Sequence, residues 1–400
     1  MRPGQGAARR APRNALSRRR AFVRPTQGGR RGVASGLTTP GRCRPRPRRH
    51  CVRAPQPRPP ACEDAIVNPS ARRILQHSGL PELVKAVSNR HRPGTRPNVF
   101  LMATPRSGST WLMELIWSQP GFKCCDEPLN LRRPAVRRAS RIASWREMES
   151  AAGAAKIERY FRAICDGRLH SVDALPSRGK YHRFRTDRIV FKLLHGAESR
   201  LGALAADCNA RVVVLLRHPI AVSLSRKEFP RLDAFRNSVV STRFDAGQLA
   251  LADRVLADGS ELEKGVLAWC FQNALVLQGR QPDWTVVSYE QLVLDPEPLV
   301  AQLVERLQLP DPARIFAHLT EAAGNKGMSD PNTQQLLAEQ AAGRLAHKQA
   351  LVEKWRARVT PEQETAAMAL LDAFGLDAYR AGRLLPTPRY WIGGAPPALA

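Results

Sequence analysis

Short apolar runs alternate with stretches of helical spacing through the middle of the chain. The runs are bounded by polar or turn-forming residues and cover residues 99–103, 122–125, 188–194, 211–216 and 284–288. Continuous runs of this kind, rich in β-branched residues, predict strands buried on both faces, which is typical of parallel sheets. We therefore predict an α/β fold, a three-layer domain with a central parallel sheet of about five strands flanked by helices.

Helical patterns surround these runs. Apolar residues recur every three or four positions in residues 68–87, 109–118, 262–278, 333–356 and 361–374. Residues 131–186 carry shorter helical patterns rich in arginine, and their simplest interpretation is a set of solvated helix faces.

The first strand passes into its helix through a turn suited to an anion. Pro105 and Gly108 break the apolar run, and the helix is expected to begin at Ser109 and Thr110. Backbone N–H groups at a helix start have no intrahelical partner, and the helix dipole adds partial positive charge. Such a turn most often holds a phosphate, with an ordinary polar strand–turn–helix as the alternative.

This turn is close to the nucleotide-binding P-loop, G-x-x-x-x-G-K-[ST], without matching it. Ala103 stands where the first Gly would be and Ser109 where the Lys would be, while Arg106 places a positive charge inside the loop. A P-loop-like fold is therefore expected. The missing lysine normally reaches the β- and γ-phosphates, so a nucleotide kinase is the weaker alternative.

Two carboxylates follow the second strand. Asp126 and Glu127 are expected at its carboxyl end, and ligand crevices of open α/β sheets lie outside the carboxyl ends of the strands. Topology therefore places Glu127 beside the anion-binding turn. The alternatives are a surface carboxylate or a salt-bridge partner for Arg132 or Arg133.

A second polar segment follows the strand at 211–216. Arg217 is expected at the carboxyl end of this strand, and Pro219 suits the first position of the next helix. Ser225 is then expected two turns into that helix.

Together these segments resemble the sulfotransferases that use 3′-phosphoadenosine 5′-phosphosulfate (PAPS). The stretch Pro-Arg-Ser-Gly-Ser-Thr-Trp-Leu at 105–112 is similar to the family's 5′-phosphosulfate loop, in which the basic residue is Lys or Arg. Arg217 and Ser225 have the eight-residue spacing of the family's 3′-phosphate site. The nucleotide-binding residues that the resemblance implies in these segments are Arg106, Ser107, Gly108, Ser109, Thr110, Trp111, Arg217 and Ser225.

The resemblance also implies residues that act on the transferred group. Glu127 matches the glutamate that takes the proton from the acceptor hydroxyl in carbohydrate and tyrosylprotein members, and Lys192 matches a lysine that steadies the sulfuryl oxygens. Asp126 and His195 are the rival bases. Cytosolic members use a His in the spacing Lys-x-His, whereas this chain has Lys-x-x-His, which favours a non-catalytic His195 at a helix N-terminus.

Two further nucleotide contacts are implied near the end of the resemblance. Tyr289, in a Tyr-Glu-x-Leu segment, would approach the adenine near Trp111, with core packing as the alternative for both rings. Lys326 falls where the family closes a last loop over the 3′-phosphate, although only the Lys-Gly pair matches.

The implied reaction moves a sulfuryl group from PAPS to an acceptor hydroxyl. No metal is expected, because the cation of the loop meets the charge of the nucleotide. A glycan, a lipid alcohol, a phenol and a peptide tyrosine all stay open as acceptors, and the oligomeric state is not indicated.

The charge of the chain is unevenly placed. There are 63 Lys+Arg against 35 Asp+Glu, but residues 1–62 hold seventeen Arg, ten Pro and no acidic residue. The remaining 46 basic and 35 acidic residues suit a polyanionic substrate without requiring nucleic acid. Residues 1–62 are expected to be disordered, because they have few aliphatics to bury. We interpret them first as an over-extended translation start, with a transit peptide or, as a different class of function, a nucleic-acid-binding arm as the alternatives.

The remaining features set the expected organisation. No window approaches a membrane span, and the eight Cys show no C-x-x-C pairs, so we expect a cytoplasmic protein, with organelle targeting through the Arg-rich segment as the alternative. The expected parts are a disordered extension at 1–62, a helical lead-in at 63–95, the sulfotransferase-like domain at 96–380 and a tail at 381–400.

Overall fold

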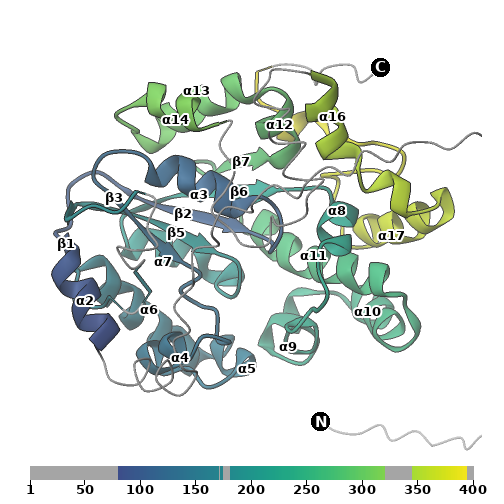
Figure 1. Cartoon of the computed structure of the whole chain (residues 1–400). Helices are drawn as coiled ribbons and strands as arrows, with labels where there is room; N and C mark the ends of the chain where they lie inside the picture. Colours follow the sequence, from purple (N-terminus) through teal and green to yellow (C-terminus); the bar gives the residue numbers. More distant parts are fainter. Residues whose placement is uncertain (1–79, 171, 174–180, 320–344, 394–400) are drawn as a thin grey trace, which may run out of the picture. The chain divides into compact units, whose positions relative to one another are not determined.

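A five-stranded parallel sheet runs through the centre of the fold (Figure 1). The computed structural model describes residues 80–170, 172–173, 181–319 and 345–393. These all belong to the unit Ile66–Ala400. The strands, in sheet order, are β3 (Phe122–Asp126), β5 (Arg188–Leu193), β2 (Asn98–Ala103), β6 (Ala210–Leu216) and β7 (Thr285–Ser288). The predicted parallel α/β architecture is confirmed.

Helices cover both faces of this sheet, because alternate strand residues point to opposite sides. Val99 and Leu101 pack with residues of α3 (Ser109–Trp117), α13 (Pro296–Leu307) and α14 (Pro312–His318). Phe100 and Met102 pack on the other side, with α6 (Ala151–Cys165), α7 (Leu201–Asp207) and α11 (Glu261–Gln278). In Figure 1, α13 and α14 lie above the sheet and α6 and α7 below it.

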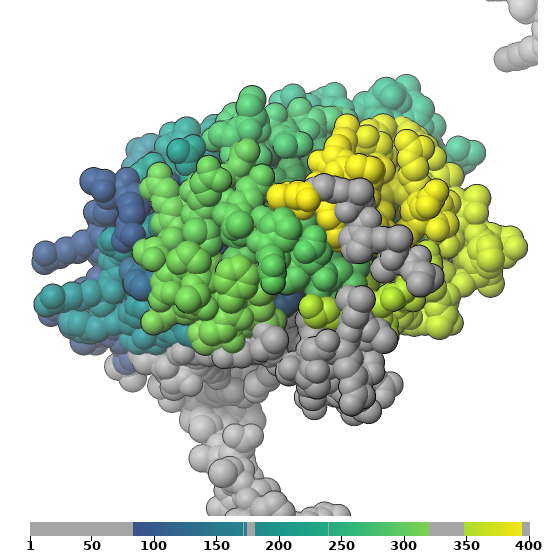
Figure 2. Space-filling model, turned by 90° about the horizontal axis from the view of Figure 1, so that it is seen from above, coloured from purple at the N-terminus to yellow at the C-terminus, as the bar shows by residue number. Residues whose placement is uncertain are grey.

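The remaining elements extend this framework. The helices are α2 (Leu80–Ser88), α4 (Pro134–Ser140), α5 (Trp145–Met148), α8 (Pro219–Leu224), α9 (Leu232–Arg236), α10 (Ala246–Asp258), α12 (Tyr289–Leu294), α16 (Leu345–Glu353) and α17 (Pro361–Ala373). Short 3₁₀ turns are η2 (Glu198–Arg200), η3 (Val239–Arg243), η5 (Arg356–Arg358) and η6 (Pro388–Tyr390). Helix α16 packs on α12. In Figure 2 yellow residues near the C-terminus lie beside green residues of the preceding segment.

Some details differ from expectation. Helix α8 begins at Pro219 as predicted but ends at Leu224, so Ser225 is its C-cap and not an interior residue. His195 lies in a bend after β5, not at a helix N-terminus. A second parallel sheet, of β1 (Arg90–His91) and β4 (Arg185–Thr186), was not predicted. Within the described part of residues 381–400, Tyr390 and Trp391 are buried.

The sheet brings the predicted site residues to one edge. All five strands are parallel, so their carboxyl ends lie side by side. Asp126 pairs with Lys192 across β3 and β5, and Leu216 pairs with Ser288 across β6 and β7. The segments that follow the strands therefore meet there. Among the described helices, none is long and apolar enough to cross a membrane.

Candidate active site

The turn between β2 and α3 is built from hydrogen bonds to one carbonyl. The Ser107 hydroxyl and backbone N–H both donate to the Thr104 carbonyl oxygen, at 2.7 and 3.3 Å. Arg106 and Gly108 have φ of 73° and 88°, in the left-handed region. A Cβ on Gly108 would lie 2.5 Å from Cδ2 of Tyr289, so this position needs glycine for its backbone and for its neighbour.

Gly108 is also the N-cap of α3, and it supplies no side-chain cap. The first N–H groups of the helix, at Ser109, Thr110 and Trp111, therefore point out of its N-terminus without an intrahelical acceptor. The helix dipole adds to their partial positive charge. The strand, turn and helix that the sequence predicted are all present, and this end of α3 is suited to hold a phosphate.

Lys192 joins this helix end to the two carboxylates. Its Nζ donates to Oγ1 of Thr110 at 3.0 Å and lies 2.6 Å from Oδ1 of Asp126 and 3.4 Å from Oε1 of Glu127. The Lys192 side chain is only 5 % exposed, whereas that of Asp126 is 45 % exposed. A buried ammonium needs this compensation by carboxylates, because the charge is costly to remove from water.

Glu127 is held on three sides. Its backbone, at φ 52°, donates from N–H to the Lys192 carbonyl oxygen at 3.1 Å. Its Oε1 faces Lys192, and its Oε2 accepts a hydrogen bond from Nδ2 of Asn130 at 2.6 Å. Arg132 pairs with Glu228 and Arg133 donates to the Asp126 backbone carbonyl, so neither arginine takes the salt-bridge role considered from the sequence.

The two predicted phosphate segments touch each other through Arg217. Its Nη1 donates to the Arg106 carbonyl oxygen at 2.8 Å, and its guanidinium carbon lies 4.1 Å from the ring centroid of Tyr289. The ring of Trp111 meets Tyr289 edge to face, with centroids 6.4 Å apart. Trp269 donates from Nε1 to the Arg217 carbonyl oxygen at 3.1 Å, which fixes the end of β6. The side chains of both Trp111 and Tyr289 are partly buried.

Ser225 and Lys326 stand apart from this group. The Ser225 hydroxyl donates to the Ala221 carbonyl oxygen at 2.7 Å, within its own helix, although a hydroxyl that donates once can still accept. Lys326 lies outside the described residues.

His195 is a poor match for a base. Burial, and then the positive charges of Arg231, Arg226, Arg132 and Lys192, hold the pKa of His195 well below its usual range. Its ring packs on Trp145, with centroids 5.4 Å apart. A general base works best when its pKa lies near the operating pH, so this imidazole would accept a proton weakly.

Sequence reasoning missed three residues around the site. They are Asn130, which bonds to Glu127, Glu290, which bonds to the backbone after β6, and Arg226, which follows Ser225. Asn130 and Glu290 have local signals, since one lies three residues after Glu127 and the other directly after Tyr289. Arg226 gave no signal in a chain this rich in arginine.

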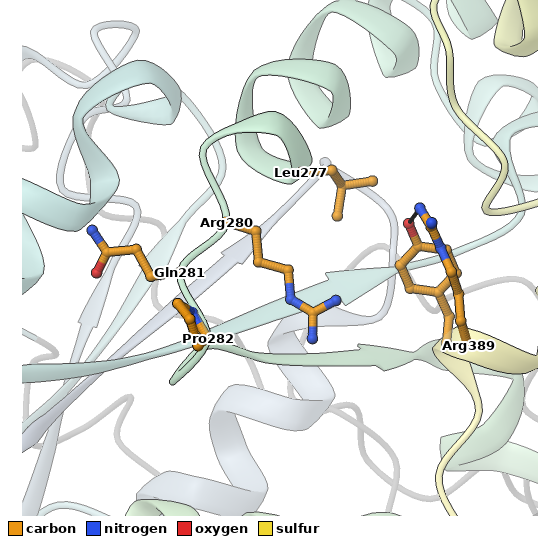
Figure 3. Close-up of a pocket in the computed structure, with 6 residues that line it drawn as sticks. Leu277, Arg280, Gln281, Pro282 and Arg389 are labelled. Atoms are coloured by element: carbon orange, nitrogen blue, oxygen red, sulfur yellow. Dashed lines mark hydrogen bonds between the residues drawn. The ribbon is translucent and has the colours of Figure 1, made fainter.

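A hollow in the described surface lies away from these residues. It has a volume of about 370 Å³ and is lined by Leu277, Arg280, Gln281, Pro282, Arg389 and Tyr390. Figure 3 shows the Arg280 side chain extending below Leu277, toward the side of the hollow where Arg389 lies. Residues 280–282 precede β7, so this hollow lies at the amino end of that strand, and it contains none of the predicted site residues.

No curated protein matches the sequence. Solved structures with a similar chain course include the sulfotransferase domain from the Synechococcus PCC 7002 olefin synthase (18% identity, 73% of this chain and 98% of that chain, TM-score 0.37). Another is mouse sulfotransferase SULT7A1 complexed with PAP (14% identity, 72% of this chain and 88% of that chain, TM-score 0.34). A third is sulfotransferase STF9 from Mycobacterium avium (14% identity, 78% of this chain and 84% of that chain, TM-score 0.36). The family model described as "Sulfotransferase family" matches residues 97–313, which is more than half of the chain and includes the strands and turns of the site. The chain therefore belongs to the sulfotransferase family.

Proposed function

We propose that this sulfotransferase moves a sulfuryl group from PAPS to an acceptor hydroxyl at the carboxyl edge of the sheet. The observation that carries the proposal is the hydrogen bond from Arg217 to the Arg106 carbonyl, 111 residues away in the sequence. Two segments suited to two different phosphates are thereby joined in one surface. A nucleotide with phosphates at both its 5′ and 3′ positions fits such a pair, whereas ATP lacks the 3′-phosphate.

The residues divide between the two phosphates. Arg106 and the N–H groups from Gly108 to Thr110 hold the 5′-phosphate and stabilise charge on the leaving oxygen. Arg217 and Ser225 hold the 3′-phosphate, and Lys326 is a further candidate there. Trp111 and Tyr289, whose rings meet beside Gly108, offer flat faces for the adenine.

Glu127 is the proposed base. PAPS supplies the activated sulfuryl group; the acceptor oxygen bonds to sulfur as the bond from sulfur to the 5′-phosphate oxygen breaks. The electron pair of that bond leaves with 3′-phosphoadenosine 5′-phosphate (PAP), and the acceptor proton passes to a carboxylate oxygen of Glu127. Lys192, between Thr110 and Glu127, stabilises the negative charge on the sulfuryl oxygens. A positioned base contributes roughly 10²–10⁴-fold in rate, and positioning and charge stabilisation supply the rest.

Calorimetry of nucleotide binding tests the proposal. PAP should bind about ten- to a hundredfold more tightly than 5′-AMP, because one charge-assisted contact contributes roughly 1.5–3 kcal/mol. Arg217→Ala should abolish that preference. Arg280→Ala, which removes the same charge at the opposite edge of the sheet, should keep it. Equal affinity of the native protein for PAP and AMP would exclude the assignment.

Transfer itself is then measured with radiolabelled PAPS and a panel of acceptors that contains a glycan, a lipid alcohol, a phenol and a tyrosine peptide. Label on at least one acceptor is expected. Tight binding of PAP without transfer to any class would contradict the proposed reaction while leaving the nucleotide site intact.

A further inference from the structure

Arg226 is a partly buried cation that faces a small cavity beside the site. It follows Ser225, and its guanidinium carbon lies 4.9 Å from the ring centroid of Phe229. The cavity is also lined by His195, Arg231 and Gln272. The cavity has a volume of about 10 Å³, which is room for one oxygen atom.

Arg231, which also lines the cavity, and Lys192 of the proposed site have acidic partners. Arg231 is paired with Glu198 and, at 3.0 Å, with Glu149, and all three side chains are buried. Lys192 is paired with Asp126 and Glu127.

Arg226 differs from these cations. Among the described residues, no carboxylate pairs with its guanidinium, and the charged groups that act on it are Arg231 and Arg132. Burial, and then these two positive charges, lower the pKa of Arg226 to about 10, so it remains charged at neutral pH. Arg132 itself pairs with Glu228 at 2.6 Å, but both side chains are more than half exposed, so water screens that pair.

A partly buried guanidinium with five donors and no carboxylate beside it has little to offset the loss of its contacts with water. Its planar fork matches the paired oxygens of a carboxylate, sulfate or phosphate. The local excess of positive charge therefore favours an anion from outside the described chain.

Hydrogen bonds connect the cavity and its surroundings to the proposed transfer site. Nε2 of Gln272, which lines the cavity, donates to the carbonyl oxygens of Ala103 and Leu194, at 3.1 and 3.2 Å, and these residues end β2 and follow β5. Arg132, whose charge acts on Arg226, donates from its backbone N–H to Asn130 Oδ1 at 3.1 Å, and Asn130 bonds to Glu127. Arg226 is thus connected to the segment that holds the proposed base.

We propose that Arg226, with Arg132 and His195 beside it, binds an anionic group of the acceptor, so that the acceptors are hydroxyl compounds carrying a carboxylate, sulfate or phosphate. One oxygen of that group enters the cavity, and the hydroxyl of the same molecule reaches Glu127. This inference rests on the proposed sulfuryl transfer for the identity of the site, and it adds the acceptor class.

The test measures acceptor binding to the protein already saturated with PAP, so that no turnover is needed. Matched pairs differ in the presence of one anionic group: methyl glucuronide against methyl glucoside, 4-hydroxybenzoate against 4-hydroxybenzamide, and glucosamine 6-sulfate and 6-phosphate against glucosamine. In at least one pair the anionic member should bind about tenfold or more tightly, as expected for a charge-assisted fork. The pair that responds identifies the source of the anion.

Three variants separate Arg226 from general effects. Arg226→Gln should remove the preference for the anionic member, and Arg226→Lys, a charge without the fork, should keep only part of it. Arg132→Gln, at an exposed position, should weaken it by a smaller factor. Arg280→Gln is the matched control for loss of one positive charge and should leave it unchanged.

Two results would overturn the inference. One is an absence of preference in every pair for the native protein, which needs no variant and no assumption about folding. The other is a loss of PAP affinity in Arg226→Gln as large as that in Arg217→Ala, which would assign Arg226 to the nucleotide. If the native protein fails to prefer PAP over AMP, it is the proposed function that has failed, which is a different outcome.

Discussion

Oε1 of Glu290 accepts a hydrogen bond from the backbone N–H of His218 at 2.9 Å, across 72 residues of sequence. Its Oε2 accepts from the Tyr379 hydroxyl at 2.7 Å. The carboxylate is buried, and that burial raises the pKa of Glu290. Glu290 therefore fixes the backbone beside Arg217 from the helix that begins with Tyr289.

Glu290→Gln should weaken this connection while preserving the shape of the side chain. One end of an amide donates hydrogen bonds, so it cannot accept from both His218 and Tyr379. We expect a loss of roughly 1–3 kcal/mol in the free energy of unfolding, measured with urea, and a few-fold weaker binding of PAP.

Tyr379→Phe is the control, since it removes only the bond to Tyr379 and leaves the backbone of His218 held. It should lose stability without a change in PAP affinity. Unchanged stability and affinity in Glu290→Gln would show that the bond to His218 does not position Arg217.

The anion-binding turn was predictable because its determinants are local. Pro105, Arg106 and Gly108 occupy one short stretch after a continuous apolar run, and both the run and the helix that follows have distinct periodicity. The contacts of Glu290 and Asn130 are different. They depend on which side chain the fold brings to an unpaired donor, and no periodicity encodes that.

The end of α8 and the second sheet also could not be predicted from sequence periodicity. The Ser225 hydroxyl bonds to the Ala221 carbonyl at the point where the helix stops, and a serine signals such local bonding without fixing its place. Strands β1 and β4 have two residues each and are largely polar, so they lack an apolar run to predict them. That no carboxylate of the described residues pairs with Arg226 depends on its three-dimensional surroundings, which the sequence pattern does not indicate.

Glu127→Gln should separate chemistry from nucleotide binding. The amide keeps the shape of the side chain and cannot take the acceptor proton, while Glu127 touches neither phosphate segment except through Lys192. We expect kcat to fall by roughly 10²–10⁴-fold and PAP affinity to stay within a few-fold of the native value. Radiolabel transfer and calorimetry measure the two quantities.

Asp126→Asn and His195→Ala are the comparisons for the base. The Asp126 carboxylate lies closer to Lys192 than that of Glu127, so its loss should disturb the lysine but leave a base in place. Near-native transfer in Glu127→Gln together with a severe loss in either other variant would reassign the base.

Gly108→Ala should lower both the stability of the protein and its affinity for PAP. At φ 88° a side chain is strained, and the new Cβ would press on the Tyr289 ring 2.5 Å away. We expect a loss of about 1 kcal/mol or more in stability from the backbone alone. PAP affinity should also fall by at least tenfold as Tyr289 moves from Arg217.

Gly382→Ala is a matched control, with φ 72° and nothing within 4 Å of its added Cβ. It should show the loss of stability without the loss of affinity. Native PAP binding in Gly108→Ala would mean that Tyr289 does not contribute to the nucleotide site.

Stability should fall on acidification because of a buried neutral histidine. His218 is fully buried and its ring stacks on Trp355, with centroids 4.2 Å apart. Burial lowers the pKa of His218 from 6.5 to about 3. Between these pH values the imidazole is neutral in the folded chain and protonated in the unfolded chain. The contribution of this histidine is complete above pH 6.5 and is lost as the pH falls toward 3. Between about pH 7.5 and 5.5 it amounts to roughly 1.4 kcal/mol.

Urea unfolding of the native protein and His218→Gln at these two pH values measures that contribution. The variant loses the packing of the ring at both pH values. The change in its free energy of unfolding between the two pH values should be smaller than that of the native protein by about 1.4 kcal/mol. His91→Gln tests the same effect in another part of the fold, because burial, followed by the charge of Lys123, lowers the pKa of His91 to about 4. A native-like pH dependence in both variants would show that these rings are protonated in the folded protein, against the direction argued from their burial.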